Sequence, residues 1–285
     1  MEVTFWGVRG SIPAPGPGTV RYGGNTACVS VRTRGGLLVL DCGTGARNLG
    51  LALLGNEGED GFRSGKGTAA ILLSHTHWDH IQGFPFFSPL YVGGNAFHIY
   101  GPATSSALLE GILEGQMAPQ YFPVQTLKNM GARIDISAVA VGQPFEVLGC
   151  RVTAAQNPHG RVGALAFRIE DADRTLVYAS DVGYGPQGLP AATRALYQGA
   201  DLLIHDSTYT PEDRARYPQR GLASVLEAVA AGVDAGARRL ALFHYDQDYT
   251  DNDLDALVER GRRAVVEAGA PVELIAATEG LTLTV

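Results

Sequence analysis

Cysteine is scarce in this sequence, and long hydrophobic runs are absent. Among 285 residues there are three cysteines, Cys28, Cys42 and Cys150, an odd number at wide spacing. Such spacing supports neither a disulfide framework nor a Cys-x-x-Cys metal site, and it favours buried, reduced thiols. No apolar segment approaches the roughly 18 residues that cross a bilayer, and the first residues do not read as a signal peptide. We therefore expect a cytoplasmic protein with no membrane partner.

Positive charge is also in short supply. Lysine and arginine number 22 against 29 aspartates and glutamates, which gives a net charge of −7. The chain therefore lacks a general basic surface, and this argues against an extended nucleic acid as a partner. A small phosphorylated substrate remains open, because bound divalent metals would dominate the local field. No segment has the composition of a linker, so we expect a single domain over residues 1–285.

Histidines are few, but five of the seven belong to a dense pattern. The pattern consists of His75, His77, Asp79 and His80 within one short segment, followed far along the chain by His159 and His244. Imidazole and carboxylate groups cost free energy to bury unless something satisfies them, and they are the usual ligands of divalent metals. The dense segment follows an apolar run at residues 69–73, so it lies at the carboxyl end of a buried strand, where open α/β sheets place their ligand sites.

The same pattern, an apolar run that ends in a possible ligand, recurs along the chain. It is seen before Asp41, His159, Asp181, His205-Asp206 and His244. Core packing gives no reason for this regularity, whereas one rim that carries the chemistry does. Because adjacent strand residues point to opposite faces, we expect Asp206 rather than His205 to reach the site. The remaining histidine, His98, is expected to pack in a strand.

The pattern resembles the metallo-β-lactamase superfamily over nearly the whole chain. The resemblance implies one metal held by His75, His77 and His159, and a second metal held by Asp79, His80 and His244. It implies that Asp181 bridges the two metals and that Asp41 supports the histidine segment without binding metal. Two Zn²⁺ ions are expected from so many histidines, although Mn²⁺ or Fe would also suit the carboxylates.

Further segments, at residues 5–13, 21–26, 80–87 and 203–209, resemble the phosphodiesterase-like members of this superfamily. These members include ribonuclease Z, class II cyclic-nucleotide phosphodiesterases and the phosphodiesterase linked to carbon–phosphorus lyase. The resemblance implies hydrolysis of a small nucleotide or related diester by a hydroxide that bridges the metals. It makes Asp79 and Asp206 the expected catalytic residues. Arg9, Arg21 and Asn25, beside a glycine- and proline-rich loop, are the expected substrate contacts.

Two departures from this subgroup leave alternatives open. Leu222 stands where those relatives carry a histidine that assists the reaction, and Asp206 matches the acidic partner of that histidine. The short stretch 160–180 leaves no room for the arm with which ribonuclease Z grips transfer RNA, so we expect no extended nucleic acid partner. The alternatives are a thioester or lactone hydrolase on the same site, and a non-catalytic, metal-stabilised nucleotide sensor.

Strand and helix patterns interleave in both halves of the chain. Strands are expected at 3–8, 27–32, 37–40, 69–73, 145–155, 164–169, 175–179, 274–276 and 281–285, and helices at 45–54, 103–113, 222–231 and 254–266. The α/β order favours a four-layer αββα sandwich with the metals at one edge of two facing sheets, which is also the fold that the resemblance implies. Aromatic residues 84, 86, 87 and 91 either fill the core or form the surface of a homodimer.

Overall fold

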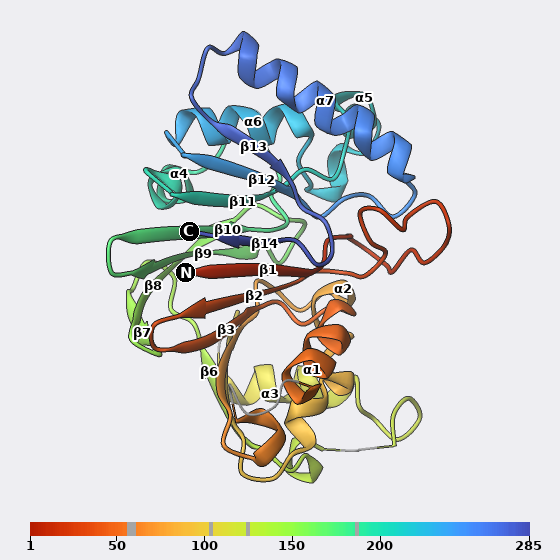
Figure 1. Ribbon diagram of the computed structural model, residues 1–285, viewed down its shortest axis with the longest axis vertical. Helices are drawn as coiled ribbons and strands as arrows, with labels where there is room; N and C mark the ends of the chain where they lie inside the picture. The colour runs from red at the N-terminus through yellow and green to blue at the C-terminus, as the bar shows by residue number, and fades with distance from the viewer. Residues whose placement is uncertain (56–60, 103–104, 124–125, 186–187) are drawn as a thin grey trace.

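Two seven-stranded sheets face each other, with helices on both outer sides (Figure 1). The computed structural model describes residues 1–55, 61–102, 105–123, 126–185 and 188–285. The first sheet contains, in spatial order, β14 (Thr282–Thr284), β1 (Glu2–Gly7), β2 (Cys28–Thr33), β3 (Gly36–Leu40), β4 (Thr68–Leu72), β5 (Ala96–Gly101) and β6 (Arg133–Ala138). The second contains β13 (Glu273–Ala276), β12 (Arg239–Phe243), β11 (Leu202–Asp206), β10 (Arg174–Ala179), β9 (Ala164–Asp171), β8 (Cys150–Asn157) and β7 (Phe145–Val147).

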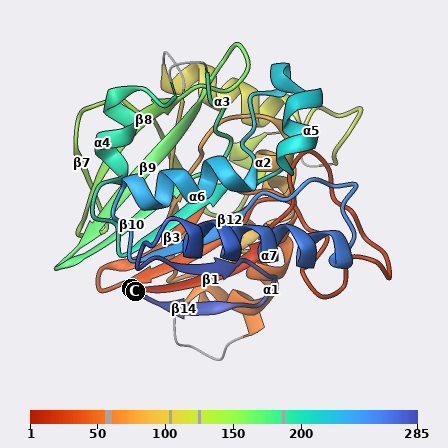
Figure 2. The same ribbon diagram turned by 90° about the horizontal axis from the view of Figure 1, so that it is seen from above.

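Helices cover the outer face of each sheet. The first sheet is covered by α1 (Gly45–Gly55) and α3 (Ser106–Gly115), and the second by α4 (Ala191–Tyr197), α6 (Val225–Asp234) and α7 (Asp251–Glu267). Seen from above, α6 and α7 lie side by side across the strands (Figure 2). The short helices α2 (Trp78–Ile81) and α5 (Pro211–Arg216) follow β4 and β11. The expected four-layer αββα sandwich is confirmed.

The two sheets share one pattern of strand directions. In each, three antiparallel strands lead into a parallel set: β1, β2 and β3 before β4 to β6, and β8, β9 and β10 before β11 to β13. Consequently β3 and β10 are corresponding strands. The carboxyl ends of parallel strands meet at one rim, so both sheets deliver the residues after those ends to the same edge of the sandwich.

Local chemistry explains where predicted and observed elements differ. The expected strand 145–155 is interrupted because Leu148 and Gly149 adopt positive φ angles of 47° and 76°, which turn the chain between β7 and β8. The expected helix 222–231 begins later, because the Ser224 side chain and Glu227 form a capping box. Strand β6 and helix α4 had no sequence prediction. The expected helix 103–113 includes residues 103 and 104, which lie outside the described residues.

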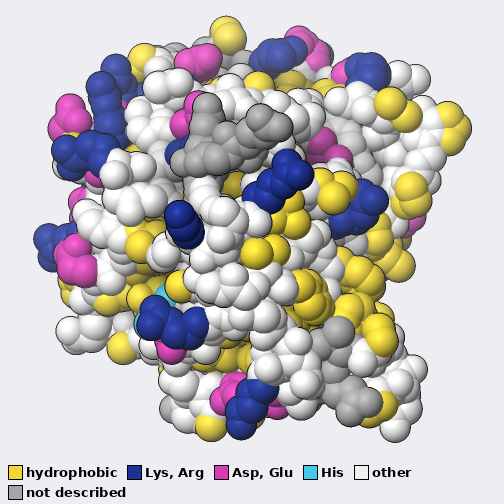
Figure 3. Space-filling view, turned by 60° about the horizontal axis from the view of Figure 1, so that its bottom comes forward, with side chains coloured by type: hydrophobic (Ala, Val, Ile, Leu, Met, Phe, Trp, Pro, Cys, Tyr) yellow, Lys and Arg dark blue, Asp and Glu magenta, His cyan; other side chains and the backbone are white. Residues whose placement is uncertain are grey.

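Part of the aromatic surface lies in the core and part is exposed. Phe84 and Phe87 are fully buried, whereas Phe86 is 56% exposed. The lower face of the molecule, on the side of α1 and α3, carries hydrophobic side chains among scattered basic ones (Figure 3). The homodimer therefore stays a prediction. Among the described residues, no helix has both the length and the apolar character needed to cross a membrane.

Candidate metal centre

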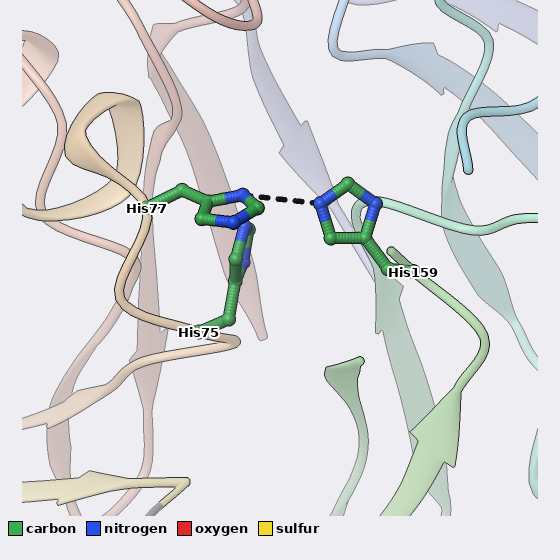
Figure 4. A group of neighbouring side chains, drawn as sticks. All are labelled: His75, His77 and His159. Atoms are coloured by element: carbon green, nitrogen blue, oxygen red, sulfur yellow. Dashed lines mark hydrogen bonds between the residues drawn. The ribbon is translucent and has the colours of Figure 1, made fainter. Parts of the chain in front are cut away.

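Seven ligand-type side chains from four separate segments meet at one rim of the sandwich. His75 and His77 lie in the turn after β4, and Asp79 and His80 belong to α2. The other three follow β8, β10 and β12 and are His159, Asp181 and His244. Figure 4 shows His159 reaching across to His75 and His77 from the opposite side. The structure thus brings together all seven residues that the sequence proposed as metal ligands.

The first group consists of His75, His77 and His159. Its nitrogens lie within 4.8 Å of one another, and His159 Nε2 is 3.1 Å from His77 Nδ1. The Nε2 atom of His75 is buried and has no hydrogen-bond partner among the described residues. A buried, unpartnered imidazole nitrogen costs free energy, and a cation at this position would satisfy it. The group therefore fits a metal by both its chemistry and its unpartnered atom.

The second group consists of Asp79, His80 and His244. His80 Nε2 and His244 Nε2 are 3.3 Å apart, and each is 3.2 Å from Asp79 Oδ2. The backbone N–H of Ser11 donates to the same Asp79 oxygen at 2.6 Å and fixes its orientation. Two imidazole nitrogens and one carboxylate oxygen form a second set of suitable ligands.

Asp181 lies between the two groups and offers one oxygen to each. Oδ1 is 3.5 Å from His159 Nε2 and 3.9 Å from His75 Nε2. Oδ2 is 3.0 Å from His80 Nε2 and 3.3 Å from His244 Nε2. A carboxylate in this position can bind two cations at once.

The outward-facing ring nitrogens are held by neighbouring groups. His159 Nδ1 donates to the Gly221 carbonyl at 2.8 Å, which leaves Nε2 as the free acceptor that faces the site. His80 Nδ1 lies 2.7 Å from Asp41 Oδ2. Asp41 also accepts hydrogen bonds from the backbone and hydroxyl of Ser74 and from the Tyr178 hydroxyl. Its geometry is that of the supporting residue that the sequence predicted.

Backbone strain is concentrated at this rim. Ser11, Asp41, Asp181 and His244 adopt left-handed φ angles of 66°, 57°, 56° and 61°. Each costs about 1–2 kcal/mol for a residue with a side chain, so the surrounding structure must hold it in place. Gly10 packs directly against the His244 ring: a Cβ atom built at Gly10 would lie 2.2 Å from His244 Cε1. The ligands are therefore positioned by the backbone as well as by hydrogen bonds.

Burial and neighbouring charges together set the pKa values of the ligand-type side chains. Burial lowers the pKa of His75 well below its usual value. For His244, burial acts in the same direction, but Asp181, Asp79 and Asp206 together raise the pKa to about 9. Burial also opposes ionisation of Asp181, yet the histidines around it, His244 and His80 foremost, hold its pKa well below the ordinary value. A metal that binds here must therefore displace protons from imidazole nitrogens.

The three expected substrate contacts do not line this site. The prediction is wrong for Arg9, whose side chain is fully buried and donates to the carbonyls of Gly23, Asp246 and Tyr249. Arg21 forms an ion pair with Asp255, and the Asn25 side chain donates to Glu279. These three side chains instead fasten the loop at residues 10–25 to the segments at 246–255 and 279.

Asp206 is also not placed as a catalytic residue. Its carboxylate is fully buried and accepts hydrogen bonds from the backbones of Val182, Thr208 and Ala223 and from the Thr208 hydroxyl. The prediction that Asp206 reaches the reacting groups is wrong, because these four donors turn the carboxylate into the protein. It holds together three segments that surround the ligands.

A cavity of about 500 Å³ opens above the two ligand groups. Besides five of the ligands and Gly160, its walls are formed by Ser11, Ile12, Trp78, Arg220, Leu222 and Gln247. A larger hollow of about 700 Å³, with Arg174 and Asp201 in its wall, contains none of the seven ligands and has no comparable cluster. Sequence reasoning missed Trp78, although it lies inside the histidine segment, and it missed Arg220, for which no motif gives a signal.

Comparisons with known proteins agree with this arrangement. A family profile described as "Beta-lactamase superfamily domain" matches residues 38–245. The chain is 24% identical to ribonuclease Z of Myxococcus xanthus (strain DK1622), over 91% of this chain and 92% of that protein. Two solved structures share the fold. Zn²⁺-bound PqqB from Methylobacterium extorquens has a TM-score of 0.72, at 18% identity and full coverage of both chains. Human tRNase Z, short form, has a TM-score of 0.68, at 20% identity, and covers 100% of this chain and 99% of its own.

Proposed function

The chain belongs to the beta-lactamase superfamily, in its phosphodiesterase-like subgroup, and from that premise we propose that this metal-dependent hydrolase cleaves phosphodiesters with two bound metal ions. One observation carries the proposal: Asp181 offers one carboxylate oxygen to each of two separate three-residue ligand groups. A single ion would leave one of these groups, with its closely spaced imidazoles, without a cation.

Zinc is the proposed occupant of both positions. In the first group, His75, His77 and His159 supply three neutral nitrogens, a set that suits Zn²⁺. In the second group, Asp79 joins His80 and His244, a mixed set that also accepts Mn²⁺ or Fe. The Zn²⁺-bound state of the PqqB structure, which has the same fold, supports zinc as the first metal to test.

The residues of the chain have distinct parts in the proposed reaction. When bound, the metals supply a nucleophilic water with a lowered pKa and neutralise charge on the phosphate. Asp79 lines the cavity and stays ionised, because His80 and His244 outweigh the effect of burial and lower its pKa. Asp79 is therefore ready to bind a cation without first losing a proton. Trp78 and Leu222 contribute apolar surface to the wall of the cavity, against which the nonpolar part of a substrate can pack.

The expected range of substrates needs a correction. The sequence prediction excluded an extended nucleic acid, but the relative that matches 91% of this chain is named ribonuclease Z, so that exclusion is wrong. Neither the net charge of −7 nor the short stretch 160–180 rules out RNA, because the local field of bound metals attracts phosphate whatever the overall charge. The proposed substrate class is therefore a phosphodiester, in a small nucleotide or in RNA.

A substrate panel on the metal-loaded protein tests the proposal. The protein is stripped, reloaded with Zn²⁺ or Mn²⁺, checked by elemental analysis and offered bis(p-nitrophenyl) phosphate, cyclic nucleotides, an RNA with a 3′ extension, a thioester and a lactone. We expect two metals per chain and cleavage of at least one diester. Cleavage of the thioester or lactone with no diester turned over would contradict the proposal and favour the carboxylic-ester alternative.

Two histidine variants separate an enzyme from a sensor. His77→Ala removes a candidate ligand nitrogen and should abolish turnover. The control His98→Ala, in β5, should leave turnover unchanged, because His98 hydrogen-bonds to Ser137, stacks on Tyr100 and belongs to none of the ligand groups found among the described residues. If wild-type protein turns over nothing, and the His77→Ala protein keeps a nucleotide-dependent shift of its melting temperature, the chain is a sensor and the proposal fails.

A further inference from the structure

A single cationic side chain faces the cavity above the ligand groups. Among the described residues that line this cavity, Arg220 is the only lysine or arginine. It lies at the end of the 3-10 helix at Pro218–Arg220, two residues before Leu222. Its side chain is exposed, and no carboxylate of the described chain lies within ion-pair distance of it. The guanidinium charge is therefore available to a ligand in the cavity.

Two tyrosines hold the guanidinium group in one orientation. Arg220 donates from one terminal nitrogen to the Tyr209 hydroxyl at 2.9 Å, and its Cζ lies 4.7 Å from the centre of the Tyr217 ring. The Tyr209 ring is almost fully buried, so this anchor is fixed in the protein. A guanidinium has five N–H donors, and this arrangement uses one of them. The others form a rigid fork whose shape matches the oxygens of a phosphate.

The backbone next to Arg220 is tied directly to a metal ligand. The carbonyl of Gly221 accepts a hydrogen bond from His159 Nδ1 at 2.8 Å. Gly221 has a φ of 65°, and a Cβ atom there would lie 2.8 Å from the backbone nitrogen of Gly160. The two segments are therefore in close contact. This contact holds the backbone next to Arg220 beside the first ligand group.

We propose that Arg220 binds a phosphate oxygen of the substrate and supplies, from a neighbouring position, the positive charge that Leu222 cannot provide. This inference rests on the proposed phosphodiesterase function. Leu222 lines the cavity beside His159 and Gly160, and its side chain has neither charge nor donor. Ser11 and Gln247, the other polar wall residues outside the ligand set, can donate hydrogen bonds but cannot neutralise charge. Arg220 accordingly contacts the substrate, and Tyr209 and Tyr217 are positioning residues.

Binding of inorganic phosphate to the zinc-loaded protein tests the role of Arg220 without requiring turnover. By calorimetry, we expect Arg220→Ala to bind phosphate about tenfold more weakly or worse, because it loses charge-assisted hydrogen bonds. Tyr217→Leu should weaken binding by a smaller factor, since only the orientation of the fork is lost. The matched control is Arg216→Ala: Arg216 is exposed in α5, pairs with Asp213 and does not line the cavity. This control should bind phosphate like the wild type.

Equal phosphate affinity in Arg220→Ala and wild-type protein would overturn the inference. If Arg220→Ala loses zinc by elemental analysis, Arg220→Lys and Arg220→Gln replace it: lysine should retain more affinity than glutamine, and equal affinities would overturn the proposal as well. The outcome is separable from that of the proposed function. Weakened phosphate binding in a protein that cleaves no diester would leave the Arg220 assignment standing while the phosphodiesterase proposal fails.

Discussion

The two halves of the molecule end corresponding strands with the same residue type in the same strained conformation, yet the two residues have different surroundings. Asp41 follows β3 and Asp181 follows β10, with φ angles of 57° and 56°, and both are buried. Asp41 accepts two hydrogen bonds from Ser74 and one from the Tyr178 hydroxyl, and lies 2.7 Å from His80 Nδ1. Asp181 accepts one, from the Ser180 hydroxyl, and otherwise faces imidazole nitrogens.

The comparison shows that the nearby hydrogen-bond donors, and not the backbone position, decide whether a buried carboxylate supports a histidine or is left to bind a cation. Asp41 is satisfied by the protein in the absence of any ion, so it can only support. Among the described residues, Asp181 has only the Ser180 hydroxyl as a neutral donor, so its charge depends on cationic neighbours, either protonated imidazoles or metals, because a buried charge without a partner is very costly. The left-handed turn delivers both carboxylates to the rim; the hydroxyls and N–H groups nearby then fix one as a support and leave the other as a ligand.

Exchanging each aspartate for asparagine tests the contrast most strongly. Asp181→Asn keeps the shape of the side chain but removes the charge shared by both ligand groups, so we expect turnover to be lost beyond detection. The number of metals bound per chain, measured by elemental analysis, should fall below two. A variant that still binds two metals and turns over like Asp41→Asn would show that the two carboxylates are not distinct.

Asp41→Asn should have a smaller effect of another kind. The amide can still accept some of the hydrogen bonds but holds His80 less well, so we expect turnover or metal affinity to fall by about 10–100-fold, the usual range for residues that orient ligands. Excess zinc should restore activity to this variant and not to Asp181→Asn. Zinc titrations of both proteins provide the measurement, and a failure of rescue in both would contradict the assignment.

The histidines near the carboxyl ends of β4 and β11 offer a second contrast, in the direction that their side chains face. His75 and His77 face the rim, whereas His205, at the end of β11, is turned inward, near Tyr184 and the Asp206 carbonyl, and burial lowers its pKa to about 4. Folding thus keeps His205 neutral, while the unfolded chain binds a proton below pH 6.5. This costs stability as pH falls from 6.5 to about 4, by about 3 kcal/mol in total.

His205→Asn should remove that cost. Relative to wild type, the free energy of unfolding of the variant should rise by about 3 kcal/mol as pH falls from 7 to 4, because an amide does not titrate. Chemical denaturation of both metal-free proteins at several pH values measures the difference. A constant difference between the two proteins across this range would show that His205 is not held neutral by the fold.

A substitution in the hairpin before β10, compared with the hairpin before β3, should change stability the least. The first half has Gly35 and Gly36 in this region, whereas the second turns at Ala172 with a φ of 55°. Ala172→Gly relieves about 1–2 kcal/mol of steric strain and costs about 0.5–1 kcal/mol of backbone entropy. We expect a net gain of about 0.5–1 kcal/mol with unchanged turnover. Thermal unfolding measures it, and a loss of stability would mean that the alanine packs more than it strains.

The seven candidate ligands could be singled out from the sequence because most of their signal is local, whereas their division between two metals came from the family resemblance. Four ligands occupy six consecutive residues, and the others follow strands directly, so strand patterning alone brings them to one rim. The substrate contacts could not be predicted in this way. The partners of Arg9 and Arg21, such as Tyr249 and Asp255, lie more than two hundred residues along the chain. No local pattern distinguishes an arginine that braces a loop from one that faces a ligand.

The secondary structure was likewise predicted well where the signal is local and poorly where it depends on distant partners. The strands with continuous apolar sequence, such as β3 and β4, are mostly buried and were predicted closely. Strand β6 reads Arg-Ile-Asp-Ile-Ser-Ala at the edge of its sheet, with exposed and half-buried residues in alternation, and its pairing with β5 sets it more than its own sequence does. Asp206 shows the corresponding limit for site residues. Its face was predicted from strand alternation, but two of its backbone donors, Val182 and Ala223, come from other segments that its own sequence does not reveal.

The contact between Gly10 and the His244 ring leaves space for a hydrogen atom and nothing larger. Any side chain at that position would push a ligand out of place, so the floor of the site resists mutation even where no ligand is replaced. The walls are different, because the side chains of Ile12, Trp78 and Arg220 project from exposed positions. Substitutions at these three wall positions can therefore change what the cavity accommodates while Gly10 and the His244 ring stay in place.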